Sequence, residues 1–369
     1  MVSTARLGLY FLRLGATGFG GPIALAGAMQ RTLVDERRWI SRDEYLEGLA
    51  LAQLAPGPLA AQLAMYIGYV RGGVGGATMV ALAFVLPSLM MVWLLGALYV
   101  RYDGLWWMRS LFYGIGAAVI GIMARSAIKL ARLTLGRDPL LWTVAIVLAV
   151  TTALTGREPV VLFLVAGTAP LMARSRRLTS LAAMILPIAG VAAAAASAPS
   201  LPAIGWFFAR AGMFVFGSGL AIVPFLYGGV VQERHWLTDR QFLDVVAVAM
   251  ITPGPVVITV AFIGYLVRGA PGLLVAAVGV FLPVYLVVVI AARWFRRYSA
   301  NVRVALFISG VTAAATGAIA GAVVVLARRA IIDWWTIAIA AATFAVLSMR
   351  RISELWLIAA AGALGIWLH

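Results

Sequence analysis

Apolar stretches long enough to cross a lipid bilayer follow one another along almost the whole chain, separated by short loops. A transmembrane α-helix needs roughly 20 consecutive apolar residues. Only 11% of the 369 residues are charged, about half the share found in a soluble domain, and the mean hydropathy is +1.01. The stretches do not alternate polar and apolar residues as the strands of a membrane β-barrel do. The sequence therefore predicts an all-α polytopic protein embedded in the lipid bilayer.

Hydropathy divides the chain into thirteen apolar segments. The expected spans lie near 7–30, 45–70, 74–100, 105–130, 140–155, 158–173, 178–198, 203–230, 241–267, 272–292, 303–327, 331–347 and 353–368. The two that contain Pro-Gly-Pro, 45–70 and 241–267, are candidates for re-entrant rather than crossing helices. If all thirteen cross, the basic loop residues divide 16 to 10 between the two sides. Because basic loops favour the cytoplasm, we expect a multi-pass protein of the inner (plasma) membrane with a cytoplasmic N-terminus.

The residue types that the chain lacks exclude several classes of function. There is no cysteine, so disulfides and thiolate chemistry are excluded. The two histidines, His235 and His369, are too few for a histidine metal site, and no Walker A motif is present. We therefore expect no cofactor, no metal and no enzymatic activity. The net charge of +16 comes mainly from arginines in short loops, where orientation signals belong, so nucleic acid is not an expected partner.

The chain contains an internal repeat. At an offset of 197, Phe11, Arg13, Gly15, Phe19, Gly20 and Ala24 match Phe208, Arg210, Gly212, Phe216, Gly217 and Ala221. The same offset pairs Pro56-Gly57-Pro58 with Pro253-Gly254-Pro255, and an offset of 196 pairs Ile67-Gly68-Tyr69 with Ile263-Gly264-Tyr265. Matches in this order indicate a duplication.

The repeat predicts two homologous six-span halves, residues 1–177 and 201–369, joined by a linker span at 178–200. Seven spans lie between the starts of the halves. Because seven is odd, the halves would have opposite orientations in the membrane. Inverted repeats of this kind recur in secondary transporters, whose substrate sites lie near the bilayer midplane at interrupted helices. The sequence thus favours a transporter.

The Gly/Pro breaks can bind an anion without a charged side chain. Proline is favoured as the first residue of a helix, so Pro58 and Pro255 are expected to begin half-helices, and Pro22 a third. Free amides at a helix start stabilise an anion, and glycine lets backbone approach a ligand; ordinary kinks are the alternative. The expected free N–H groups belong to Leu59, Ala60, Ala61, Val256, Val257 and Ile258. The candidate binding residues are Gly20, Gly21, Pro22, Gln53, Pro56, Gly57, Pro58, Gln62, Gly217, Ser218, Gly219, Thr252, Pro253, Gly254 and Pro255.

Three arginines lie within apolar spans, where a charge at the bilayer centre costs about 2.5 kcal/mol or more. Arg13 and Arg210 are repeat equivalents, so a two-fold relation would bring both toward one centre, whereas Arg125 has no arginine counterpart. The planar guanidinium suits tetrahedral oxyanions, so all three are candidate substrate ligands. Snorkelling of Arg13 to the interface is the alternative. The equivalent acids Glu47 and Asp244 could relay protons, the alternative being solvated carboxylates at helix ends.

Together these motifs resemble the chromate transporter family in its long, two-domain form. The resemblance is carried by Phe19-Gly20-Gly21-Pro22, Arg37-Arg38-Trp39-Ile40, Gln53 to Pro58 with Gln62, Gly68-Tyr69, Phe84 to Ser88 and the second copy from Phe208 to Pro283. It implies export of chromate across a prokaryotic inner membrane, powered by the proton gradient or the membrane potential, and hence chromate resistance. Family members often carry histidine shortly after the Phe-Gly-Gly-Pro motif, where this chain has Leu25.

We therefore expect a secondary transporter that exports chromate by alternating access, with the oxyanion held at the facing breaks by Arg13 and Arg210. A sulfate or other oxyanion carrier is the alternative within transport, because sulfate resembles chromate in shape and charge. An intramembrane enzyme acting on a lipid-linked phosphate is the alternative of another class, although the spans offer almost no general base or metal-binding acids. The expected partners are chromate, with sulfate as competitor, and lipid; a homodimer remains open.

Overall fold

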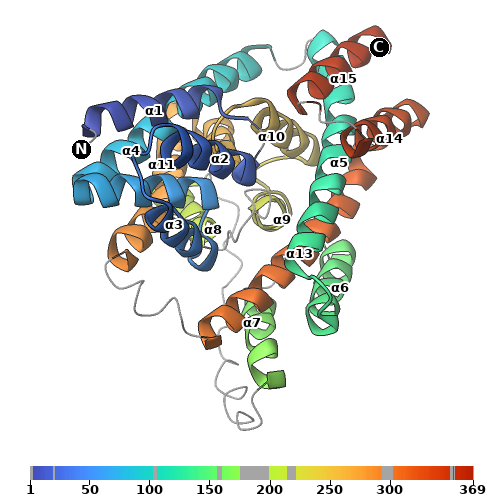
Figure 1. Cartoon of the computed structure of the whole chain (residues 1–369). Coiled ribbons are helices and arrows are strands. Elements are labelled where there is room, and N and C mark those ends of the chain that lie inside the picture. Colours follow the sequence, from blue (N-terminus) through green and yellow to red (C-terminus); the bar gives the residue numbers. More distant parts are fainter. Residues whose placement is uncertain are drawn as a thin grey trace.

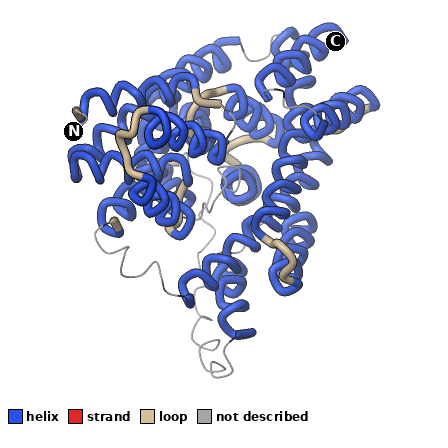
Figure 2. Tube along the Cα trace, viewed as in Figure 1, coloured by secondary structure: helices blue, strands red, loops and turns tan. Residues whose placement is uncertain are grey.

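The computed structural model describes residues 3–19, 21–102, 106–155, 160–174, 199–213, 222–292, 302–349, 352 and 354–368, and the regular elements in this part of the chain are all helices, joined by short loops (Figure 2). In chain order the helices are α1 (Thr4–Thr17), α2 (Gly21–Met29), the π-helix η1 (Gln30–Glu36), α3 (Arg42–Leu54), α4 (Leu59–Tyr102), α5 (Trp106–Thr134), α6 (Pro139–Thr155), α7 (Val160–Arg174), α8 (Leu201–Met213), α9 (Ile222–Leu226), the π-helix η4 (Tyr227–Glu233), α10 (Asp239–Ile251), the 3-10 turn η5 (Val256–Ile258), α11 (Thr259–Ala291), α13 (Val302–Ala330), α14 (Trp334–Met349) and α15 (Glu354–Leu368).

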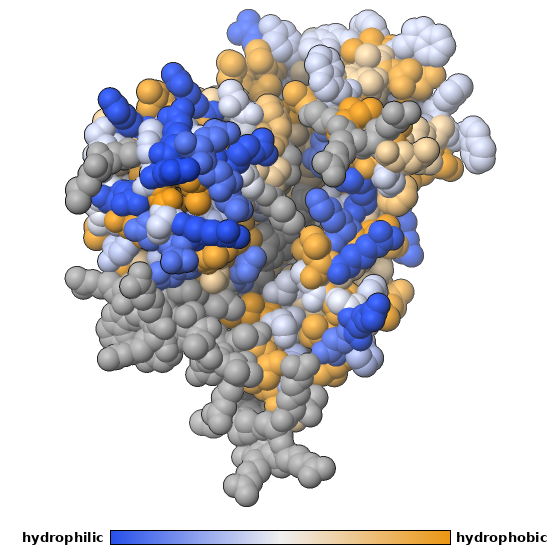
Figure 3. All heavy atoms as spheres, in the orientation of Figure 1, coloured by the Kyte–Doolittle hydropathy of each residue, from blue (hydrophilic) through white to orange (hydrophobic). Residues whose placement is uncertain are grey.

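Four apolar helical stretches in the described residues are long enough to cross a membrane: α4, α5, Val256–Ile290 and α13. The apolar helices α6, α14 and α15 are shorter, with 15 to 17 residues each. Hydrophilic side chains gather over the part of the surface around α2 and α3 (Figure 3). These features identify a multi-pass all-α membrane protein. The thirteen expected crossings are not reproduced as thirteen long helices, and the expected linker span at 178–198 lies outside the described residues.

The predicted duplication is confirmed element by element. The π-helices η1 and η4 begin and end 197 residues apart, as do α3 and α10, and α5 and α13 lie 196 residues apart. Each half has a non-glycine residue at φ 51° before its α3 or α10 helix, Arg38 in one and His235 in the other. Both of these helices begin with a capping box, in which two N–H groups at the helix start are bonded reciprocally. Two copies of one local fold therefore make up the chain.

Helices α4 and α11 each fold back on themselves at equivalent positions. Gly73 has φ 58° and ψ −146°, and Gly269 has φ 62° and ψ −151°. A straight helix separates residues eight apart by about 12 Å, yet Gly68 lies against the carbonyl of Gly76. Each helix is therefore a hairpin with a short arm before the turn (59–71 and 256–267) and a long arm after it (74–102 and 270–291).

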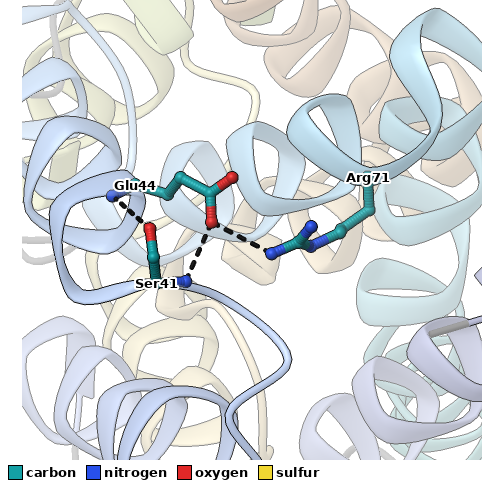
Figure 4. Close-up of polar contacts among 3 residues, drawn as sticks. All are labelled: Ser41, Glu44 and Arg71. Atoms are coloured by element: carbon teal, nitrogen blue, oxygen red, sulfur yellow. Dashed lines mark hydrogen bonds and ion pairs between the residues drawn. The ribbon is translucent and has the colours of Figure 1, made fainter. Parts of the chain in front are cut away.

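The first Pro-Gly-Pro triplet lies at the tip of a second hairpin, formed by α3 and the short arm of α4. Glu44 at the start of α3 accepts a hydrogen bond from Arg71, at the end of the short arm, at 3.0 Å (Figure 4). The same carboxylate accepts from the backbone of Ser41 at 2.8 Å and thereby caps α3. Because the outer ends of the two helices meet, they are antiparallel. Each has 13 residues, about 20 Å at 1.5 Å per residue, less than the roughly 30 Å hydrocarbon core.

Helices α1 and α2 form a third hairpin. The chain leaves α1 at Thr17 and enters α2 at Gly21, and Tyr10 then donates a hydrogen bond to the carbonyl of Ala28 at 3.4 Å. Residues 10 and 28 lie at similar distances from the turn, so the two helices run in opposite directions. The single span expected at 7–30 is therefore wrong in detail, whereas the segment expected at 45–70 forms a short hairpin, in agreement with the re-entrant alternative. A hydropathy profile cannot distinguish two short apolar helices that run in opposite directions from one long helix, because the profile contains no information on chain direction.

The helices form two bodies, and each body contains elements of both halves (Figure 1). The hairpin body consists of α1–α4 and α8–α11, in which α1 packs on α4, α8 on α11, and α4 on α11. The long-helix body consists of α5–α7 and α13–α15. Within it, α5 packs against α14 and α15 from the second half, and α13 packs against α6 and α7 from the first. The halves are thus intertwined through their last two helices.

The long arms of α4 and α11 are antiparallel. Thr78, five residues after the turn in α4, forms a 2.7 Å hydrogen bond with Tyr285, far along the long arm of α11. Conversely, Gly96, far along the long arm of α4, lies against the ring of Tyr265, just before the turn in α11. The turns at Gly73 and Gly269 therefore lie at opposite ends of the hairpin body.

Candidate functional site

The two Pro-Gly-Pro breaks are buried inside the hairpin body. Helix α3 ends where Ala55 donates its N–H to Leu51, and the prolines that follow have no N–H to continue the ladder. Gly57 has φ +139° and Gly254 has φ +93°, conformations that favour glycine. Both glycines, and Pro58 and Pro255 after them, are buried. The triplets thus form two enclosed turns, each of which begins a new helix.

Each break packs against the other half of the chain. The N–H of Gly254 donates to the carbonyl of Gly18, in the turn after α1, at 2.8 Å, and Gly254 also lies against Ser88 of α4. Ser88 in turn donates to the carbonyl of Gly15 at 3.2 Å. On the other side, Gly57 lies against Val284 of α11, the residue equivalent to Ser88 at the offset of 196. The tips of the hairpins therefore meet between the halves.

Free backbone amides follow both breaks. The N–H groups of Leu59, Ala60 and Ala61, at the start of the short arm of α4, have no hydrogen-bond acceptor among the described residues. The first amide of this helix that is hydrogen-bonded belongs to Gln62, which donates to the carbonyl of Pro58. After the second break, the N–H groups of Val256 and Val257 are free in the same sense. The expectation for Ile258 is wrong, because its N–H donates to Pro255 at 2.9 Å, which tightens the chain into a 3-10 turn.

A polar side chain follows each break at equivalent positions. Gln62 is fully buried, and its amide nitrogen donates to the carbonyl of Pro56 at 2.8 Å. Its amide oxygen, Oε1, has no hydrogen-bond partner. The equivalent residue, Thr259, is 1% exposed and donates to the carbonyl of Val256. The hydroxyl of Thr252 donates to Val248 within α10.

The remaining candidates at the breaks are dispersed or lie outside the described residues. Gly21 begins α2 and Pro22 is its second residue, and Leu25, three residues on, is buried beside Gly18. Gln53 is exposed on α3. Those outside the described part are Gly20, Gly217, Ser218 and Gly219.

The three intramembrane arginines have different surroundings. Arg13 is exposed on α1 and Arg210 is half-buried on α8, and no contact between them occurs in the described part of the chain. Arg210 lies close enough to Arg234 for the two charges to interact. Burial lowers the pKa of Arg234; Glu233 offsets part of this effect and Arg210 adds to it. Arg125 and its neighbour Lys129 lie near enough to Glu354, at the start of α15, for their charges to interact with it.

A cavity of about 610 Å³ lies between the two bodies, and sequence reasoning did not predict it. It is lined by Trp106, Arg109, Ser110, Phe112, Tyr113 and Gly116 of α5, by Asp239, Arg240, Leu243 and Asp244 of α10, and by Arg329, Ala330, Ile332 and Asp333 around the end of α13. A second cavity of about 460 Å³ shares Asp239 and Arg329 with it. Neither is lined by residues of the Pro-Gly-Pro breaks, so the breaks are closed off from both.

Asp244 lies on the wall of this cavity, on the helix that leads into the second break. It is 5% exposed and accepts a hydrogen bond from Tyr99 of α4 at 2.7 Å. The alternative of a solvated carboxylate is therefore wrong for this residue. Its repeat equivalent, Glu47, is only half-buried. The signal that could have identified Asp244 is its place within an otherwise apolar stretch of α10, from Phe242 to Ile251.

Replacing Asp244 by leucine is expected to lower the free energy of unfolding by about 1–3 kcal/mol, because the buried hydroxyl of Tyr99 loses its acceptor. Asp244→Asn keeps an acceptor oxygen and is expected to cost less. Thermal unfolding in detergent measures both, and Glu47→Leu at the equivalent half-buried position is the matched control. Equal melting temperatures for the Asp244→Leu and Glu47→Leu variants would contradict this account of the pair.

The architecture defines the class of protein. A duplicated, multi-pass helical membrane protein whose interrupted helices meet between its halves has the construction of a membrane transporter. The chain matches the family described as chromate transporter over residues 5–197 and 202–366, that is, through both halves. It belongs to the chromate transporter family.

Named relatives agree with this assignment. The chain is 56% identical to the chromate transport protein of Cupriavidus metallidurans over 348 residues, which cover 92% of this chain and 87% of that protein. It is 54% identical to a probable chromate transport protein of Synechococcus elongatus over 339 residues, 90% and 86% of the two chains. It is 32% identical to the chromate transport protein of Pseudomonas aeruginosa over 335 residues, 86% and 80% of the two. No solved structure matches the chain.

Proposed function

We propose that this protein transports chromate out of the cytoplasm by alternating access, with the oxyanion bound at the two Pro-Gly-Pro breaks. The observation that carries the proposal is the burial of each break against the opposite half of the chain, together with the amides of Leu59, Ala60 and Ala61, which have no acceptor in the described chain. Free amides at a helix start are an anion site. The substrate follows from the relatives at 54–56% identity, which are named for chromate transport.

An inverted repeat is part of this proposal. The halves are residues 1–177 and 201–369, with a linker at 178–200. Support comes from the antiparallel long arms of α4 and α11, because their turns at Gly73 and Gly269 lie at opposite ends of the hairpin body. Two halves of opposite orientation provide two equivalent access routes to one site. The cavity between the bodies would open and close as they move relative to one another.

The direction of transport follows from electrostatics. With the N-terminus in the cytoplasm of an inside-negative cell, a divalent anion that leaves gains about 2 × 2.3, or roughly 4.6 kcal/mol per 100 mV. Export can therefore run on the membrane potential of the inner membrane. A sulfate carrier is the second candidate, since the same amides bind either oxyanion. The enzyme alternative lacks support at the breaks, because their buried polar residues, Gln62, Thr252 and Thr259, include no general base.

Chromate uptake into inverted membrane vesicles tests the proposal. We expect potential-dependent accumulation that falls at least about tenfold in the Arg13→Gln and Arg210→Gln variants, because a hydrogen bond to a charged group contributes about 1.5–3 kcal/mol. Arg6→Gln is the matched control, since Arg6 is also exposed on α1, two helical turns earlier. Unchanged uptake in both variants would remove the arginines from the site. Uptake of sulfate alone would change the substrate, and uptake of neither anion would reopen the enzyme alternative.

A further inference from the structure

The side chain of Gln62 brings a hydrogen-bond acceptor to a site otherwise composed of donors. Its orientation is fixed by Pro56, whose carbonyl can only accept and lies 2.8 Å from the amide nitrogen of Gln62. The nitrogen must therefore face Pro56, and Oε1 must face elsewhere. Gln62 is fully buried and Oε1 has no partner. A buried acceptor without a donor is unfavourable, so this oxygen is suited to a ligand that brings an O–H or N–H group.

The position of Gln62 places its side-chain amide group at the break itself. Its amide lies over the first Pro-Gly-Pro turn, because a Cβ on Gly57 would be 2.7 Å from the amide nitrogen and 3.0 Å from Cδ. The next elements along the chain are the free N–H groups of Leu59, Ala60 and Ala61. A ligand at this turn that reaches Oε1 would meet several donors and one acceptor.

We propose that the site binds the singly protonated form of the oxyanion, hydrogenchromate, with its O–H donated to Oε1 of Gln62 and its other oxygens facing the amides of α4. This inference rests on the proposed function and specifies the ionic form of its substrate. A fully deprotonated tetrahedral oxyanion has only acceptor oxygens, and one of them would face the lone pairs of Oε1. The protonated form has one donor, which matches the one acceptor of the site.

The proposal gives a physical basis for selecting chromate over sulfate. Chromate takes up its first proton near neutral pH, whereas sulfate and selenate do so only in strong acid. At neutral pH only chromate among the three therefore supplies the required O–H. Transport of the protonated form carries one negative charge instead of two, so the membrane potential still favours export, with half the driving force given above for the divalent anion.

No histidine lies on the described helices around the first break, so histidine titration does not contribute to a pH profile of chromate binding near neutrality. Charged or titratable side chains on the helices packed against α4 are Arg6, Tyr10 and Arg13 on α1, Arg42, Asp43, Glu44, Tyr45 and Glu47 on α3, and Tyr265, Arg268 and Tyr285 on α11. The short arm itself adds Tyr66, Tyr69 and Arg71. None is histidine, the residue type whose reference pKa lies near neutrality. A binding transition in this range would therefore belong to the anion.

Equilibrium binding of chromate and of selenate to the full-length protein in detergent, measured across the neutral range, tests the inference. Selenate is the matched probe, because it has the same shape and charge as chromate but no proton. The expected chromate affinity falls about tenfold per pH unit above the point where chromate loses its proton, while selenate binds weakly at every pH. Chromate affinity that does not change with pH, or selenate binding as tight as chromate, would overturn the inference.

Variants at Gln62 separate this effect from general damage to the protein. Gln62→Met keeps the volume and removes the acceptor, so the chromate profile should become flat and the preference over selenate should disappear. Gln62→Glu keeps an acceptor oxygen and should retain the preference for acid pH. Thr143→Val, at an exposed position on α6 in the long-helix body, is the control and should keep the wild-type profile. A wild-type slope in Gln62→Met would overturn the inference alone, whereas no chromate binding by the wild type at any pH would overturn the proposed function as well.

Discussion

Replacing Gly254 by alanine is expected to abolish transport. Gly254 has φ +93°, in the region that costs an L-residue about 1–2 kcal/mol. Its new Cβ would also collide with Oγ of Ser88, which is fully buried and bonded to Gly15. Overpacking of this kind costs about 1–3 kcal/mol more. Because the N–H of Gly254 is bonded to Gly18, the collision would separate the second break from the turn after α1.

Two comparisons isolate the collision from the backbone strain. Gly136→Ala adds a Cβ at φ +51° with no atom within 4 Å. This variant should therefore show only the destabilisation caused by backbone strain and should retain transport. The double variant Gly254→Ala, Ser88→Ala removes the colliding oxygen and should recover part of the loss, as a double-mutant cycle would reveal. Chromate uptake and thermal unfolding measure both. No recovery in the double variant would show that Ser88 does not set the position of the break.

The helices that the sequence predicts best are the long ones without breaks. Helix α5 was expected at 105–130 and occupies Trp106–Thr134, and α13 was expected at 303–327 and occupies Val302–Ala330. Each is one uninterrupted apolar run, which hydropathy identifies well. The duplication was equally accessible, because matched residues at a constant offset need no structural model. The Pro-Gly-Pro breaks followed from the chemistry of proline and glycine alone.

The hairpins and the cavity could not be predicted in the same way. A reversal at Gly72-Gly73 changes the direction of the chain but not its apolar composition, so the hydropathy of the segment is unaffected. The pair formed by Tyr99 and Asp244 joins residues 145 positions apart, and a single sequence carries no signal for such a contact. For the arginines, the repeat predicted equivalent positions but not equivalent surroundings: Arg13 is exposed and Arg210 is half-buried.

The exchange of the last helices between the halves leads to the second large effect. Gly114 on α5 lies against the backbone of α15, where a Cβ would collide with the carbonyl of Ala361. Its repeat equivalent, Gly310 on α13, meets the carbonyl of Ala166 on α7 in the same way. Close backbone contact at small residues is the main means by which helices pack in a membrane. Both glycines therefore hold one half of the chain to the end of the other.

Gly114→Ala and Gly310→Ala are each expected to lower the free energy of unfolding by about 1–3 kcal/mol, because a backbone carbonyl cannot rotate away as a side chain can.

Gly116→Ala is the matched control. It lies two residues from Gly114 on α5, with no atom within 4 Å of its new Cβ, and it should gain up to about 1 kcal/mol from the helix propensity of alanine. Thermal unfolding in detergent, with chromate uptake alongside, distinguishes the three variants. If Gly114→Ala were as stable as Gly116→Ala, α5 and α15 would not be in close contact in the membrane, and the intertwining of the halves would be wrong. A loss of stability in both Gly114→Ala and Gly310→Ala would instead show that the two halves unfold as one cooperative unit.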